Sequence, residues 1–146
     1  MNQFDFNEVS AAFRSLSDPL RLRIYRLVLR APGICICDLA AICEQRQYNI
    51  SRAARELVLA GLVSQRKVGR WLHLDPAQLP VSVSFLRLVE EWPGDWFEED
   101  EKRLAAYFQS LRDGSHHSCI IRTGPRQVRI QKNTSNNPSD RRGTQP

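Results

Sequence analysis

The amino-acid sequence predicts a mainly α-helical fold with a small β-hairpin, in which two short helices form a helix-turn-helix and the hairpin forms a wing. Three observations predict this fold. Apolar residues recur at helical spacing in several short segments between residues 7 and 111. Two of these segments are joined by a tight connection at residues 44–46. A stretch at residues 62–74 mixes apolar and polar residues, with Gly69 in its turn region, as a hairpin does.

The first two helices are predicted near the start of the chain. Apolar residues recur every three or four positions over residues 7–16 and again from residue 20 onward. The boundary between these segments is marked by Asp18, a capping residue, followed by Pro19 at a first helical position. A second helix is therefore predicted to begin at Pro19 and to end near residues 31–33.

The helix-turn-helix is predicted to begin at Asp38. This residue can cap a short helix over residues 39–43, and residues 34–37 before it are expected to be extended. After a turn, a longer helix is predicted over residues 47–59, with Gly61 stopping it. This longer helix is the candidate recognition helix of a DNA-binding motif.

Two further helices are predicted after the hairpin. Apolar residues between 85 and 92 are spaced for one helix, which Pro93 ends, and residues 96–111 form the other. The last helix begins with four acidic residues, 98–101. We interpret them as a solvated helix start that complements the positive end of the helix dipole.

These elements divide the chain into three parts. Residues 1–80 form the predicted winged helix-turn-helix domain, and residues 81–113 carry C-terminal helices for dimerisation. Residues 114–146 form a polar, basic tail that is expected to be disordered. The apolar stripes of the first and last helices either pack on their own domain or form a dimer, which would place two recognition helices about one DNA turn apart.

The charge pattern favours DNA as a partner. The formal net charge is +5, and residues 46–70 hold six basic residues and one acidic residue. Residues 90–101, in contrast, hold seven acidic residues and no basic one. Positive charge is thus concentrated on the predicted recognition helix, the hairpin and the tail, where it can bind phosphates.

The sequence predicts neither a membrane-spanning segment nor a signal peptide. The N-terminus lacks the basic start and apolar core of a signal peptide, and the longest apolar run, residues 57–63, is too short to span a bilayer. A cytoplasmic location is therefore expected. The four cysteines are expected to be reduced there, as core residues, metal ligands or redox sensors rather than as disulfides.

Cys35 and Cys37 are the candidate ligand pair for a soft metal ion. Thiolates select thiophilic ions such as As(III), Sb(III), Cu(I) and Zn(II). Neither a strand nor a helix presents residues two apart as adjacent ligands, so ion binding is expected to bend the chain here and to disturb the Asp38 cap. The alternative is that both cysteines are ordinary buried residues.

Several motifs resemble those of one family of DNA-binding repressors, in the same order. They are the run of residues 16–24, Cys35-Ile36-Cys37-Asp38-Leu39, Ile50-Ser51-Arg52, Ala60-Gly61-Leu62-Val63 and Gly69-Arg70-Trp71. Together they cover about residues 10–75 and resemble the ArsR-type winged-helix repressors, in particular the arsenic-sensing branch. The resemblance implies a homodimer, formed through the terminal helices, that binds double-stranded operator DNA and is released when As(III) or Sb(III) binds the cysteine thiolates.

The sequence departs from this family's pattern at three places. Ala40 stands where a third cysteine is common, which leaves the number of ligands open. Tyr48 replaces a common proline, and Ala53-Ala54 replaces His-Leu in the recognition helix, which leaves the operator sequence open.

A third ligand has two candidates among the other cysteines. Cys119, supplied by the same or the partner subunit, is the first, and Cys43 is a weaker one because core packing explains it better. His116 and His117 could instead join Cys119 in a separate zinc, cadmium or redox site, or the segment could be an exposed one without a ligand. His73 on the hairpin is expected to be structural.

DNA contacts are expected from the recognition helix and the wing. Arginine, asparagine and glutamine can bond base edges, and basic or hydroxyl side chains can bind phosphates. The resemblance itself implies contacts by Gln47, Ser51 and Arg52. The candidate residues are Gln47, Tyr48, Asn49, Ser51, Arg52 and Arg55 on the helix and Arg66, Lys67 and Arg70 on the wing.

The sequence thus predicts a repressor of an arsenic-resistance operon. The alternatives are a zinc, cadmium or redox sensor of the same fold that uses Cys119 and the paired histidines, and a metal-buffering or interaction module that no longer binds DNA. An enzyme is not expected, because the sequence holds no phosphate-binding glycine loop, no zinc-protease motif and no plausible nucleophile and base.

Overall fold

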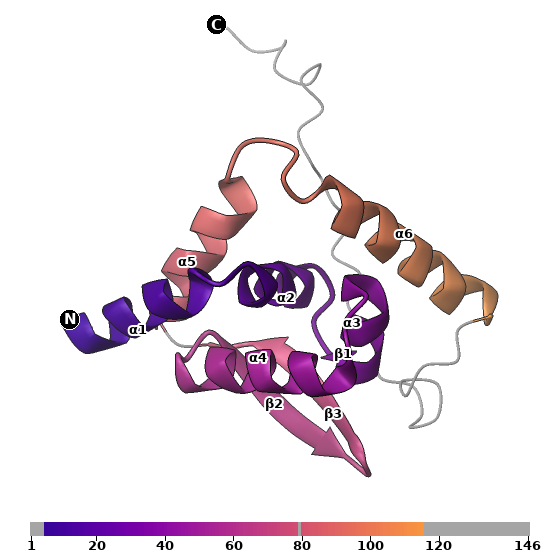
Figure 1. The fold of residues 1–146 in the computed structure, drawn as a ribbon, viewed down its shortest axis with the longest axis horizontal. Helices are drawn as coiled ribbons and strands as arrows, with labels where there is room; N and C mark the ends of the chain where they lie inside the picture. The colour runs from indigo at the N-terminus through magenta and orange to yellow at the C-terminus, as the bar shows by residue number, and fades with distance from the viewer. Residues whose placement is uncertain (1–4, 79, 116–146) are drawn as a thin grey trace, which may run out of the picture.

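The computed structural model describes residues 5–78 and 80–115 of the chain. Its helices and short strands surround a central helix, α2 (Figure 1). In chain order the elements are α1 (Phe6–Leu16), α2 (Pro19–Arg30), β1 (Ile34–Cys35), α3 (Ile36–Cys43), α4 (Gln47–Leu59), β2 (Val63–Val68), β3 (Trp71–Pro76), α5 (Pro80–Glu91) and α6 (Glu98–Asp113).

The core is built around α2. Its N-terminus is capped by Asp18, whose carboxylate accepts a hydrogen bond from the Arg21 backbone N–H at 2.9 Å, and Pro19 stands at the first position. Ile24, Tyr25 and Leu27 are fully buried on this helix. They belong to one apolar cluster with residues of α3, α4 and the sheet, so the helix-turn-helix and the wing share a core with α2.

The hairpin is confirmed and is extended by a third strand. β2 and β3 pair as antiparallel neighbours, and β1 pairs with the other edge of β3, giving the order β1-β3-β2. Cys35 lies opposite His73 in this register. The hairpin tip points away from the helices, as a wing does (Figure 1).

The helix-turn-helix is formed by α3 and α4. The predicted bounds of the recognition helix, 47–59, agree with those of α4. The predicted start of the preceding helix is wrong: α3 begins at Ile36, and its N-cap is the extended residue Cys35 (φ −91°, ψ 161°) rather than Asp38. Asp38 lies instead in the first turn, where its carboxylate complements the helix dipole from inside the fold.

The interpretation of residues 98–101 as a solvated helix start is also wrong for part of this run. Asp100 is only 4% exposed. Its two carboxylate oxygens accept hydrogen bonds from Arg23 Nε and Nη2 at 2.8 and 2.7 Å. Glu101 pairs with Arg26 and Arg30 of α2. The acidic start of α6 is therefore attached to the basic face of α2. In the described part of the chain, no helix is long and apolar enough to cross a membrane.

We expect the substitution Asp100→Asn to lower the free energy of unfolding by about 2 kcal/mol, because it removes a two-point charged hydrogen bond from a buried position. Urea unfolding followed by circular dichroism measures this. Glu98→Gln is the matched control, since Glu98 makes a solvent-exposed pair with Lys102 on the same helix, and its loss should cost at most about 0.5 kcal/mol. Equal effects of the two variants would show that the Arg23–Asp100 pair contributes no more to stability than an exposed pair does.

Candidate thiol centre and nucleic-acid interface

The two cysteines lie on either side of the junction between β1 and α3. Cys35 is the last residue of the strand, and Cys37 is the second residue of the helix. Their Cα atoms are 5.5 Å apart, and the two sulfur atoms are joined in a disulfide. The two geometries considered from the sequence were both cysteines in one strand and both in one helix. Neither case applies, because the chain changes from strand to helix between them. No unwinding of the chain is needed to bring the sulfurs together.

The expectation of reduced cysteines does not hold for this pair in the structure. A separation of 5.5 Å between Cα atoms lies well within the range of disulfides. A disulfide has no thiolate and cannot ligate an ion as a thiolate does. The structure shows the oxidised pair, and only reduction would make two thiolates available to a thiophilic ion.

Asp38 is the third member of this centre. One sulfur from each cysteine and one carboxylate oxygen of Asp38 lie within 4.8 Å of one another, close enough to surround one ion. Asp38 Oδ2 is 3.3 Å from Cys35 Sγ. Cys35 and Asp38 are buried, at 1% and 5% exposure, whereas Cys37 is half-buried. Two soft sulfurs and one oxygen fit a thiophilic ion and do not suit Mg²⁺ or Ca²⁺, which need several oxygens.

The helix α6 packs against α3 and reaches this centre. The Tyr107 hydroxyl donates a hydrogen bond to Asp38 Oδ2 at 3.4 Å. Burial, followed by the nearby Asp38 carboxylate, raises the pKa of Tyr107 well above its ordinary value, so the hydroxyl stays protonated and remains a donor. This contact joins residues 69 positions apart in the sequence, and no sequence motif indicated it.

The other candidate ligands lie elsewhere. Cys43 is the last residue of α3 and is 2% exposed, which agrees with its interpretation as a core residue. Burial raises the pKa of its thiol to about 11, so it is a poor ligand at neutral pH. Cys119, His116 and His117 lie outside the described residues.

His73 has a structural contact on the sheet. It is buried, and its Nδ1 lies 2.9 Å from the Gly33 carbonyl oxygen. A carbonyl only accepts, so Nδ1 carries the proton of this bond. The contact ties β3 to the segment just before β1 and Cys35.

The candidate DNA-binding residues of α4 form an exposed face. The six residues Gln47, Tyr48, Asn49, Ser51, Arg52 and Arg55 are exposed, and Ile50 between them is fully buried. The Arg52 guanidinium lies over the Tyr48 ring, 5.6 Å from its centroid. This stacking orders the Arg52 side chain on the surface, where its guanidinium can hydrogen-bond to a base edge or a phosphate.

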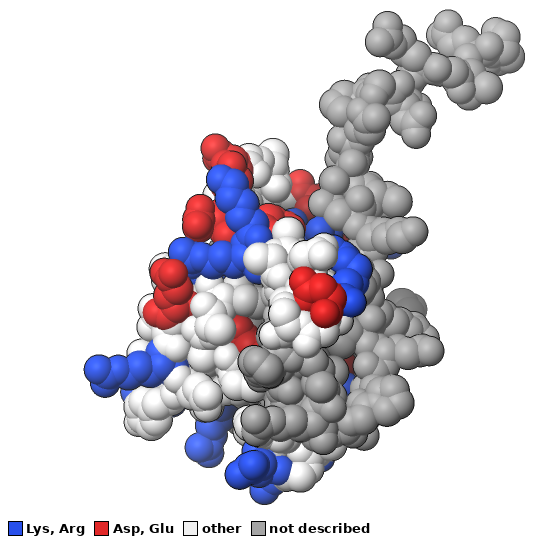
Figure 2. All heavy atoms as spheres, turned by 90° about the vertical axis from the view of Figure 1, so that its right-hand side faces the viewer, with Lys and Arg blue, Asp and Glu red and all other residues white. Residues whose placement is uncertain are grey.

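The three basic wing residues differ in their surroundings. Lys67 and Arg70 are exposed, and Arg70 lies over the Trp71 ring. Arg66 is half-buried and donates from Nε to Asp75 on β3 at 2.7 Å, so part of its charge is already neutralised. Figure 2 shows basic side chains without visible acidic ones at the lower end of the molecule, where α4 and the hairpin lie, and both signs together around the upper part.

No family model matches this chain. Its similarity to individual curated proteins shows the family instead. The chain is 33% identical to the arsenic resistance transcriptional regulator ArsR1 of Pseudomonas putida over 96 residues, which are 64% of this chain and 74% of that protein. The chain belongs to the ArsR family of transcriptional regulators.

Other members extend this relationship. The arsenical resistance operon repressor of Escherichia coli is 39% identical over 61 residues, covering 42% of this chain and 52% of the repressor. The cadmium resistance regulator CadC of Listeria innocua is 31% identical over 70 residues, covering 48% and 59%. The ArsR family thus includes relatives named for arsenic and for cadmium.

A solved structure supports the fold. The homodimeric winged helix-turn-helix DNA-binding domain Mb0332 of Mycobacterium bovis superimposes with a TM-score of 0.50 and 17% identity, over 80% of this chain and 96% of that domain. Together with the element order, this confirms the predicted winged helix-turn-helix.

Proposed function

We propose that this ArsR-family protein is a cytoplasmic, homodimeric repressor of an arsenic-resistance operon, released from its operator when arsenite or antimonite binds Cys35 and Cys37. The observation that carries the proposal is the position of the two sulfurs. They lie together at the start of α3, the helix that packs directly on the recognition helix α4. The arsenic-resistance names of several relatives support this choice of ion.

The reduced pair is the form that binds the inducer. Two thiolates displace oxygen ligands from As(III) or Sb(III), and the ion then fixes the separation of two sulfurs that the disulfide holds in contact. Asp38 offers the nearest further donor in the described residues, and Cys119 is the candidate third thiolate beyond them. The effect on DNA follows from connectivity, because Cys37 belongs to the first turn of α3 and any shift of that turn moves the helix against α4.

Cadmium or zinc is the second candidate inducer. The similarity to a cadmium resistance regulator supports it, and thiolates bind these ions as well. In this version the site is either Cys35 with Cys37 or the separate group of Cys119 with His116 and His117. Retained zinc release in a Cys35→Ser variant would favour the separate group.

DNA binding in this proposal combines α4 with the wing. Gln47, Asn49 and Arg52 present donors and acceptors to base edges, and Ser51 and Arg55 lie on the same exposed helix. On the wing, Lys67 and Arg70 are exposed and can reach phosphate, whereas Arg66 contributes less because Asp75 neutralises part of its charge. The Tyr48 ring stacks against the Arg52 guanidinium and helps to orient it.

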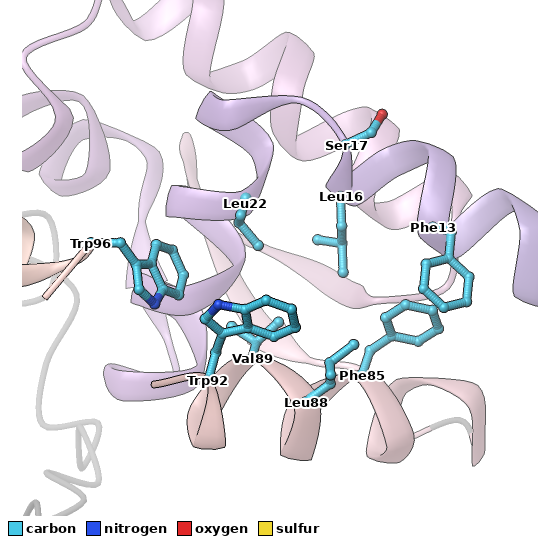
Figure 3. Close-up of a pocket in the computed structure, with 9 residues that line it drawn as sticks. All are labelled: Phe13, Leu16, Ser17, Leu22, Phe85, Leu88, Val89, Trp92 and Trp96. Carbon is cyan, nitrogen blue, oxygen red and sulfur yellow. The ribbon is translucent and has the colours of Figure 1, made fainter. Parts of the chain in front are cut away.

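The first and last helices, α1 and α6, were expected to form the dimer; in this proposal α5 takes the place of α6, because Leu104 of the apolar stripe of α6 is buried in the chain's own core. An open apolar depression of about 460 Å³ lies between α1, α2 and α5, with side chains from α5 facing those of α1 and α2 (Figure 3). Around it, Phe13, Leu88, Trp92 and Trp96 are 41–59% exposed. An exposed apolar surface of this kind needs a partner, and a second copy would bury it while placing two recognition helices on one face of the DNA.

The thiol switch is tested by fluorescence anisotropy on the DNA upstream of the protein's own gene, under reducing conditions. Arsenite should weaken DNA binding of the wild type by about 5- to 150-fold, the usual size of allosteric coupling. The double variant Cys35→Ser/Cys37→Ser should bind DNA without responding. Cys43→Ala is the control and should respond as the wild type does, because Cys43 lies in the core. An arsenite response that survives in the double variant would refute the assignment.

Base and phosphate recognition by α4 is tested with Arg52→Ala. Loss of its contact should weaken binding to the same DNA by about tenfold or more, since one good arginine contact contributes roughly 1–3 kcal/mol. The control is Arg112→Ala, an exposed arginine on α6 that hydrogen-bonds only to Gln109 among the contacts described. If both variants bind equally well, the face of α4 that carries Arg52 does not meet the DNA.

The dimer face is tested with Leu88→Glu. A buried carboxylate is costly, so the variant should move from dimer to monomer in sedimentation equilibrium and lose cooperative binding to a two-half-site operator. Leu59→Glu is the control, because Leu59 is 72% exposed on α4, away from this face. A Leu88→Glu protein that sediments as the wild type does would exclude this face as the interface.

A further inference from the structure

The helix α6 contacts both ends of α3. At the N-terminal end, Tyr107 holds Asp38 in the first turn. At the C-terminal end, Arg103 Nη1 donates to the carbonyl oxygen of Ile42 at 3.1 Å, and Nη2 pairs with Glu44 at 3.2 Å. Leu104, between the two anchors, is 1% exposed. The contacts therefore run along the length of α3.

The same helix is also fixed at its own start. Asp100 and Glu101 pair with three arginines of α2. The start of α6 is thus tied to the central helix by part-buried charged contacts, whereas Tyr107 contacts the thiol centre through a hydrogen bond of 3.4 Å. The hydrogen bond from Tyr107 is thus a contact between neutral and charged groups, whereas the start of α6 is held by ion pairs.

We propose that α6 covers the thiol centre and that its docking on α3 opposes occupation of Cys35 and Cys37, with Tyr107 and Arg103 as the positioning residues that set the affinity for a thiophilic ion. This inference rests on the proposed function of the two cysteines and adds to it the element that controls access and affinity.

The first argument is burial. Cys35 and Asp38 are almost fully buried, and Tyr107 of α6 is in direct contact with Asp38. An ion needs to replace part of its water shell by both sulfurs. It reaches Cys35 only when an element packed over the centre moves, and among residues 5–78 and 80–115 the helix α6 contacts the centre through Tyr107.

The second argument concerns one oxygen atom. Asp38 Oδ2 accepts the hydrogen bond from Tyr107 and also lies 3.3 Å from Cys35 Sγ. An ion held by the sulfurs attracts this oxygen toward itself and away from Tyr107. Occupation of the centre and docking of α6 therefore compete. By linkage, a change that weakens docking strengthens ion binding, at most by the factor by which docking is weakened.

The experiment compares three variants of the full, reduced protein. Tyr107→Phe removes the hydroxyl that holds Asp38 and keeps the ring. Arg103→Met removes the second anchor without touching the thiol centre. Tyr25→Phe is the matched control, because the Tyr25 hydroxyl is also buried and donates a hydrogen bond, to the Ser82 carbonyl oxygen at 3.2 Å, between α2 and α5.

Two readouts are measured for each protein. The first is the rate at which iodoacetamide alkylates Cys35 and Cys37, followed by mass spectrometry. The second is the dissociation constant for arsenite and, separately, for Cd²⁺, from thiolate charge-transfer absorption. Tyr107→Phe and Arg103→Met should each react about three- to tenfold faster and bind the ion more tightly by a similar factor, as loss of one hydrogen bond predicts. Tyr25→Phe should match the wild type.

The outcomes separate this inference from the proposed function. Wild-type rates and affinities in Tyr107→Phe and Arg103→Met would overturn the role of α6, and so would an equal acceleration in Tyr25→Phe, which would reflect general destabilisation. A change in Tyr107→Phe alone would restrict the effect to Asp38 and overturn the covering role. A wild type that binds neither ion would refute the thiol switch, while the alkylation rates would still decide whether α6 covers the cysteines.

Discussion

The segment from Gly33 to Ile36 connects the sheet to the helix-turn-helix, because β1 pairs with β3 and α3 begins directly after β1. The position of the two cysteines depends on this connection. Gly33 donates its backbone N–H to Leu74 at 2.8 Å and adopts a left-handed φ of +86°. A side chain there would be strained and would also approach Arg66 Nη2 to 3.2 Å. Cys35 is thus fixed by β3, and Cys37 is fixed by α3. The two sulfurs meet because two different elements hold them, not because a flexible loop does.

Local signals in the sequence were sufficient for several elements. The recognition helix was predicted with the bounds of α4 because its buried positions recur regularly and Gly61 follows its end. The start of α2 was predicted because Asp18 and Pro19 act only on the residues next to them. Asp38 misled the prediction for α3. It is a good capping residue in isolation, but pairing of Cys35 with His73 on the sheet ends the strand there and starts the helix at Ile36.

The parts of the site that sequence analysis missed depend on distant contacts. The cysteines themselves form a local motif, whereas Tyr107 comes from a helix 69 residues beyond Asp38. Asp100 was interpreted as a solvated residue because nothing within its own helix differs from a surface acidic run. Only the packing of α6 on α2, 77 residues away, gives it Arg23 as a partner. The wing residue Arg66 is a similar case, since Asp75 becomes its neighbour only once the hairpin is formed.

The position of α3 determines how much energy the proposed switch needs. This helix has only eight residues and lies between α6, which carries Tyr107 and Arg103, and the recognition helix α4. Typical coupling between two sites is about 1–3 kcal/mol, and a single hydrogen bond contributes about 0.5–1.5 kcal/mol. One or two contacts of α3 therefore carry energy of the same size as the whole response. In the proposed switch, a rearrangement of the first turn of α3 need not disturb the central helix, because Ile24, Tyr25 and Leu27 of α2 are fully buried in the core.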